Sequence, residues 1–172
     1  MGPDKMRVRR AALLCCHFMR NLTFYRAGWE NGQFLFQNNQ FWITLNNNFL
    51  DVAVLEWCKL FADVRARHCY KKVVISPTAF LPQLVSDYDK NLIEWEQYVK
   101  SIKVYRDKFI AHLDDKPTMD IPEMDWAYFS ANYLYDTLRS EGIISPNSLP
   151  RNLGEYASVC RNEAINMYKS TT

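Results

Sequence analysis

The chain has 172 residues, of which 48% are hydrophobic and 23% charged, a composition that supports one folded core and excludes a disordered tail or a fibre. Its 21 basic and 19 acidic residues give a net charge of +2, too small for the overall electrostatic signature of a histone-like nucleic-acid binder. Five glycines and seven prolines are few for this length, so they disfavour strand-rich folds with many tight turns and favour long helices.

Apolar residues recur at helical spacing along most of the chain, in segments separated by turn residues. Five main helices are predicted, at about residues 4–29, 40–67, 88–114, 123–140 and 153–169. A short turn of helix is expected at 79–84, after a proline. The predicted fold is therefore all-α, a single-domain helical bundle of four to five main helices that spans residues 1–172.

The cysteine pattern indicates free thiols rather than disulfides. There are five cysteines, two of them adjacent, and no C-x-x-C pair. An odd count without paired spacing is typical of buried cysteines in a reducing compartment, so a cytoplasmic protein is expected. A zinc site is disfavoured because adjacent cysteines do not easily chelate one ion, and no finger spacing is present. No metal or cofactor is predicted.

No membrane-spanning or exported segment is expected from the sequence. The longest apolar stretch near the start covers residues 11–16, far short of the roughly 18 residues that a spanning helix needs. The basic residues before it resemble the start of a signal peptide, but Arg20 follows quickly and no small-residue cleavage site is present.

One charged residue, Arg106, interrupts the apolar stripe of the helix predicted at 88–114. The apolar members of this stripe recur every three or four residues: Leu92, Trp95, Val99, Ile102, Phe109 and Leu113. A guanidinium in this position costs several kcal/mol to desolvate unless it meets an anion or other acceptors. On an ideal helix His112 lies about 120° around and about 9 Å along from Arg106. The two side chains therefore converge only at a shared surface, such as a groove or a twofold contact between two copies.

The segment Arg106–His112 (RDKFIAH) resembles the motif of the HEPN superfamily, in which an Arg, usually followed by a polar residue, precedes a His by four to six residues. The residues at 111–114 and the block at 57–61 resemble its abortive-infection branch. The resemblance implies a helical bundle that dimerises through the motif helices. In many members it also implies a metal-independent endoribonuclease, here a toxin or phage-defence effector with a possible antitoxin partner. Some toxin members carry Tyr two residues after the His, where this chain has Asp114, which argues against control by tyrosine modification.

The residue types of the motif suit metal-independent RNA cleavage. Near neutral pH, His112 can act as a general base or a general acid. Arg106 stays cationic and can hold a phosphate through its forked donors as negative charge develops. A homodimer supplies two histidines, hence a base and an acid, and the products are a 2′,3′-cyclic phosphate and a 5′-hydroxyl. Asp107 is either a supporting residue that orients Arg106 or His112, or an ion-pair partner of Lys103.

Further basic residues are candidates for RNA binding. Residues 65–72 concentrate Arg65, Arg67, Lys71 and Lys72 near one aromatic side chain, and Lys103 lies one helical turn before the motif. Such a cluster is able to follow a phosphate backbone. A solvated helix end has the same composition, and the sequence leaves this alternative open.

Two alternatives to the nuclease remain open from the sequence. In the first, the chain is a non-catalytic binding module in which Arg106 and His112 recognise a nucleotide or a partner protein. In the second, Arg106 forms a structural ion pair with a carboxylate on a neighbouring helix, and His112 lies near a helix end, where the helix dipole favours it.

Overall fold

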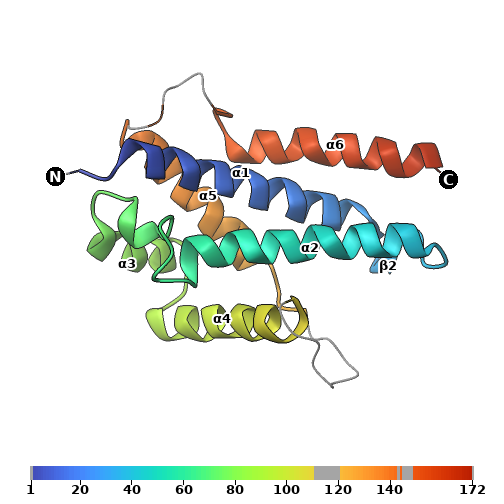
Figure 1. Ribbon diagram of the computed structural model, residues 1–172, viewed down its shortest axis with the longest axis horizontal. Helices are drawn as coiled ribbons and strands as arrows, with labels where there is room; N and C mark the ends of the chain where they lie inside the picture. Colours follow the sequence, from blue (N-terminus) through green and yellow to red (C-terminus); the bar gives the residue numbers. More distant parts are fainter. Residues whose placement is uncertain (1, 111–120, 143, 145–148, 172) are drawn as a thin grey trace.

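The structure is a computed structural model that describes residues 2–110, 121–142, 144 and 149–171; the side chains of residues 109, 110 and 171 are not among those described. Within these ranges the chain forms six α-helices and a two-stranded sheet (Figure 1). The prediction of an all-α helical bundle is confirmed. None of the described helices is both long enough and apolar enough to cross a membrane.

The first two helices run antiparallel along the length of the molecule (Figure 1). Helix α1 (Lys5–Ala27) begins where the Asp4 carboxylate accepts a hydrogen bond from the Met6 amide at 2.8 Å. Helix α2 (Gln40–Phe61) begins where the Asn39 side chain accepts from the amides of the first turn. Both caps satisfy amides that have no partner within the helix. Because the two helices run in opposite directions, the start of α1 lies at the same end of the molecule as the end of α2 (Figure 1).

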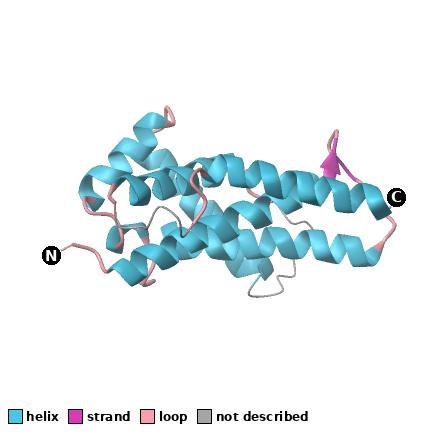
Figure 2. Cartoon of the chain, turned by 90° about the horizontal axis from the view of Figure 1, so that it is seen from above, coloured by secondary structure: helices cyan, strands magenta, loops and turns pink. Residues whose placement is uncertain are grey.

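A small hairpin that the sequence did not predict joins α1 to α2. Strands β1 (Trp29–Glu30) and β2 (Gln33–Phe34) pair antiparallel around Asn31 and Gly32, both with positive φ (50° and 76°). An Asn-Gly pair with two positive φ angles is the favoured two-residue hairpin turn. Figure 2 shows the hairpin projecting beside the long helices at the end where the C-terminus lies.

Helix α2 ends earlier than the predicted range of 40–67. The amides of Ala62 and Asp63 both donate to the Cys58 carbonyl, and the helix stops at Phe61. An irregular segment follows, and it ends in the short 3₁₀ turn η1 (Tyr70–Lys72). The sequence-based boundary is wrong because the helical spacing of residues 62–67 gives no sign that the backbone turns away there.

The predicted helix at 88–114 divides into two parts in the structure. After α3 (Pro77–Asp87), α4 (Leu92–Tyr105) begins with a capping box between Asn91 and Glu94. The continuation is a π-helical turn, η2 (Arg106–Ile110). The start at residue 88 is therefore wrong by four residues, because the capping box fixes the first turn at Leu92.

The last two helices complete the bundle and close its core. Helix α5 (Asp125–Ser140) lacks a capping side chain of its own; instead the Tyr98 hydroxyl accepts from the Ala127 amide and donates to the Glu123 carbonyl. Helix α6 (Leu153–Thr171) packs against α1. Trp57 is fully buried, and its indole N–H donates to the Ser130 hydroxyl at 2.9 Å. This buried hydrogen bond joins α2 to α5 inside the core against which α4 packs.

Candidate functional site

The guanidinium of Arg106 lies at the junction of α4 and the π-turn. In the apolar stripe that leads to it, Trp95 and Ile102 are buried and Val99 is half-buried, whereas Leu113 and the side chain of Phe109 lie outside the described part of the chain. Leu92 is an exception: it is 44% exposed because it lies in the first turn, at the open end of α4. The side chain of Arg106 is only 17% exposed. The sequence therefore correctly predicted a cation in a largely buried position.

Two carboxylates hold this cation. Nη1 of Arg106 donates to Asp63 at 2.7 Å, and Nε donates to Asp107 at 2.8 Å. Asp63 belongs to the irregular segment after α2, 43 positions away in sequence. Nη2 makes no hydrogen bond with an oxygen atom of any residue that the structure describes, although the Cys58 thiol is a further hydrogen-bond partner of the guanidinium. We call Arg106, Asp63 and Asp107 together the Arg106 clamp.

The clamp fixes the charge state of the arginine. Burial alone favours the neutral form, but the hydrogen bonds to Asp63 and Asp107 outweigh it and raise the pKa of Arg106 above its ordinary value. The clamp combines one positive with two negative charges. It keeps the guanidinium ionised and oriented, but its own field does not attract an anion.

The Cys58 thiol lies against the same guanidinium. Burial raises the pKa of Cys58 to about 12, although the adjacent Arg106 favours the thiolate. This thiol therefore stays protonated near neutral pH and does not act as a nucleophile. All five cysteines are free and buried. Among the described residues no group of three His, Cys, Asp or Glu side chains is placed to hold a metal ion.

His112, the second predicted catalytic residue, lies outside the described residues, as does Asp114. The estimate of about 120° between Arg106 and His112 assumed an α-helix through both residues. The π-turn at 106–110 invalidates that assumption, because its i→i+5 bonds widen the turn. Single π-turns inside helices occur frequently at functional sites. This π-turn lies within the motif from which the functional site is predicted.

Of the two alternatives for Asp107, the first is observed in part. Its carboxylate orients Arg106, and no ion pair with Lys103 is found among the described residues. The other open alternative, an ion pair of Arg106 with a carboxylate of a neighbouring helix, is also observed in part: the partner is Asp63, which lies just after α2 and which the sequence did not identify. Its only signal was an acidic residue near the end of a predicted helix, and no local spacing connects positions 63 and 106.

The other predicted RNA-binding residues fall into two groups. Arg65, Arg67, Lys71 and Lys72 are exposed in the irregular segment that also carries Asp63. Lys103 is half-buried on α4. The structure therefore connects the basic segment 65–72 to the motif through one shared loop, which the sequence did not reveal.

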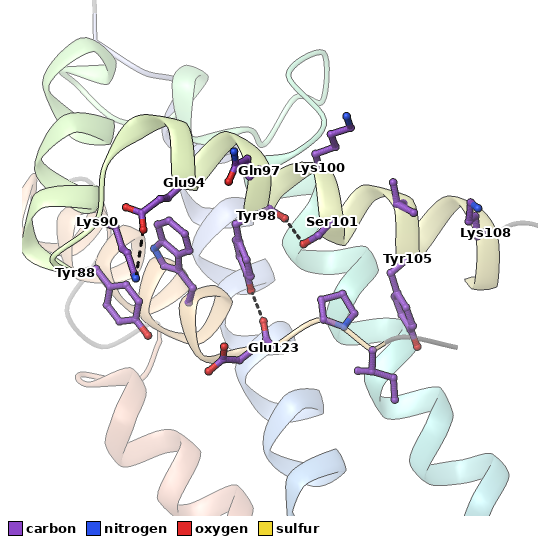
Figure 3. A pocket seen from close by; sticks show the side chains of 14 residues that line it. Tyr88, Lys90, Glu94, Gln97, Tyr98, Lys100, Ser101, Tyr105, Lys108 and Glu123 are labelled. Atoms are coloured by element: carbon purple, nitrogen blue, oxygen red, sulfur yellow. Dashed lines mark hydrogen bonds and ion pairs between the residues drawn. The ribbon is translucent and has the colours of Figure 1, made fainter. Parts of the chain in front are cut away.

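A groove of about 890 Å³ runs along the other side of α4, toward the start of α5 (Figure 3). At one end its charges are engaged, since Lys90 pairs with Glu94 at 3.5 Å. In the close-up view Tyr98 points from α4 toward Glu123, whereas Lys100 projects away from it. Arg106 does not line this groove. The groove and the clamp thus occupy different sides of the motif helix.

No protein-family model, curated protein or solved structure matches this chain. The resemblance to the HEPN superfamily therefore depends on the motif and its place in a helical chain, and it stays a prediction.

Proposed function

We propose that the chain is a metal-independent endoribonuclease of the HEPN type that cleaves RNA at a composite site of Arg106 and His112 in a homodimer. The observation that carries the proposal is the Arg106 clamp, a mostly buried guanidinium that two carboxylates orient at a π-turn inside the motif. An arginine held in this way is pre-organised, and its remaining nitrogen, Nη2, supplies donors for a phosphate.

In the proposed reaction, one His112 removes the proton of the RNA 2′-hydroxyl, and the 2′-oxygen attacks the adjacent phosphorus. Arg106 stabilises the phosphorane as negative charge accumulates. The second His112 protonates the departing 5′-oxygen, which leaves a 2′,3′-cyclic phosphate and a 5′-hydroxyl. The O2′–P bond forms and the P–O5′ bond breaks, while one histidine accepts a proton and the other donates one, so atoms and charges balance.

The exposed apolar side chains on α4 support a dimer. Leu92 and Val104 are each 44% exposed and Ile93 is 68% exposed, on a helix at the edge of the bundle (Figure 1). Burying them against a second copy removes apolar area from water. A toxin or phage-defence role with an antitoxin partner, and a cytoplasmic location, belong to the same proposal; the five free thiols support the location.

A second candidate function follows from the charge of the clamp. Two carboxylates already accept from Nε and Nη1 of Arg106, so the cation is neutralised locally. That arrangement also suits a structural role for Arg106 in a non-catalytic module, in which the motif region binds a nucleotide or a partner protein through other groups. Stabilisation of the protein against heat by mononucleotides, without RNA cleavage, would support this candidate.

The test is incubation of the protein with a single-stranded RNA in excess chelator, followed by analysis of the product ends. The proposal predicts fragments with 2′,3′-cyclic phosphate and 5′-hydroxyl ends, and their loss in His112→Ala. The matched control is Arg151→Ala, an exposed position outside the motif, which keeps activity. Intact RNA, or equal cleavage by His112→Ala, contradicts the proposal. Size-exclusion chromatography with light scattering checks the dimer, and a strict monomer removes the composite site.

A further inference from the structure

A basic region separate from the Arg106 clamp lies at the end of the molecule where α1 begins and α2 ends. Because the two helices are antiparallel, the first turns of α1 lie beside the last turn of α2 and the segment after it (Figure 1). We call this region the basic end surface. It consists of Arg7, Arg10, Lys59, Arg65, Arg67, His68, Lys71 and Lys72.

The cations of the basic end surface come from separate elements, and four of them lie near His68. Arg7 and Arg10 are three residues apart, so they share one face of α1. Lys59 is on the last turn of α2, and Arg67 is on the irregular segment. The positive charges of all four act on the imidazole of His68. Sequence reasoning found only the part at 65–72, since nothing in the sequence connects Arg7 and Arg10 to it.

Few carboxylates neutralise this surface. Arg7 pairs with Asp4 at 3.7 Å, and Lys59 pairs with Glu56 at 3.2 Å; both basic side chains remain nearly half exposed. Arg10 and Arg67 form no ion pair with any residue in the described part of the chain. The basic end surface holds seven of the 21 arginines and lysines in a chain whose net charge is only +2, so its local charge exceeds that of the whole molecule.

His68 adds an unsatisfied polar group to the same region. Its Nε2 is buried and has no hydrogen-bond partner among the described residues. Burial first, and then the charges of Arg10, Lys59, Arg67 and Arg7, lower the pKa of His68. A polyanion placed over these cations would reduce their repulsion and favour protonation of the imidazole.

We infer that the basic end surface binds the phosphate backbone of RNA. Arginine predominates in it, and its forked donors match phosphate oxygens. A membrane surface is less well matched because α1 buries its apolar face in the core, so no amphipathic helix is left to insert there. The choice of RNA as the polyanion rests on the proposed function, whereas the charge of the surface does not.

The test measures binding rather than cleavage. A fluorescent single-stranded 2′-O-methyl RNA lacks the 2′-hydroxyl nucleophile, so fluorescence anisotropy reports affinity alone. The double variant Arg10→Glu/Arg67→Glu should weaken binding by about tenfold or more at low salt. It should also reduce the slope of log affinity against log salt by about 1.4, since each phosphate contact on a single strand contributes about 0.7.

The matched control is Arg9→Glu/Arg161→Glu, which changes the net charge equally at two exposed arginines. Arg9 lies on α1 between Arg7 and Arg10 in sequence but points in another direction around the helix. Equal loss of affinity in both double variants contradicts the inference, because it shows attraction by net charge alone. Binding to vesicles of phosphatidylcholine and phosphatidylserine, with none to RNA, also overturns it.

The pH dependence gives a second readout. If the backbone lies over His68, RNA binding takes up a proton there, so affinity rises as pH falls below about 6.5. His68→Gln should flatten this dependence, so that the difference in affinity between the two proteins is larger at about pH 5.5 than at about pH 8. The same pH profile in both proteins contradicts the placement of the backbone beside His68. Binding without cleavage refutes the proposed nuclease but not this inference; cleavage with unchanged affinity in Arg10→Glu/Arg67→Glu refutes the inference alone.

Discussion

The Arg106 clamp and the basic end surface both contain arginine and are connected by the irregular segment after α2, but carboxylates neutralise the cation of the clamp and leave most cations of the surface unpaired within the described part of the chain. In the clamp a mostly buried cation has two carboxylate partners at 2.7 and 2.8 Å. On the basic end surface, exposed cations have few carboxylates. The difference follows from desolvation: a buried charge must be paired locally, whereas an exposed charge is hydrated and acts over a longer range.

The difference also assigns separate roles to the two regions. A paired and oriented guanidinium suits the precise contacts of a reacting phosphate, while unpaired surface cations suit attraction of a long anion. The shared segment carries Asp63 for the first region and Arg65, Arg67 and His68 for the second. RNA held on the basic end surface would therefore contact the same segment that orients Arg106.

The largest stability effect is expected inside the clamp. Asp63→Ala leaves the mostly buried Arg106 with one carboxylate, so the free energy of unfolding should fall by about 2 kcal/mol. Asp107→Ala should cost about 0.5 kcal/mol, because Asp107 is 55% exposed and its pairing is weakened by water. Urea denaturation measures both. In a double-mutant cycle Asp63→Ala should couple to Arg106→Ala, and a coupling near zero would show that the clamp does not hold Arg106 in solution.

A smaller effect is expected in the titration of His68. Its pKa in the folded protein lies below the ordinary value of about 6.5, so the unfolded chain binds more protons just below that pH. The contribution of His68 to stability is therefore fully present above pH 6.5 and is lost as the pH falls toward the folded-state pKa. NMR titration of the imidazole should show the lowered pKa, and Arg10→Ala should raise it. An Arg9→Ala control should leave it unchanged; an equal rise in both variants would refute the proximity of Arg10.

The smallest stability effect is expected for single cations of the basic end surface. Arg67→Ala should change the free energy of unfolding by no more than about 0.5 kcal/mol, because an exposed cation without an ion pair has little to lose. Removing repulsion should even stabilise the variant slightly at low salt, and added salt should abolish the difference. A loss comparable to that of Asp63→Ala would show that Arg67 is also locked in a structural pair.

The sequence predicted most of the helices because their apolar spacing and caps are local signals. The predicted segment at 153–169 agrees closely with α6 (Leu153–Thr171), and that at 123–140 with α5 (Asp125–Ser140). The early end of α2 was missed, since it depends on where the backbone turns rather than on composition. The π-turn was also missed, because no local pattern in residues 106–110 distinguishes it from an α-helix.

The candidate site was predictable only in part, for the same reason. Arg106 was identified because it interrupts a local pattern, and Asp107 because it is adjacent. The roles of Asp63, Arg7 and Arg10 could not be predicted from the sequence, because each of these residues approaches its neighbours only through tertiary packing. Charge clusters assembled from distant segments leave no signature in a single sequence.

The most direct test of the account is the cleavage rate of a defined RNA in chelator by Arg106→Ala and by the unchanged protein, at a temperature where denaturation curves show both to be folded. If Arg106 stabilises the transition state, the rate should fall by about 10² to 10³, as for loss of one well-placed donor to a developing anion. An unchanged rate in the folded variant would show that the clamp serves stability alone and would contradict the proposed site.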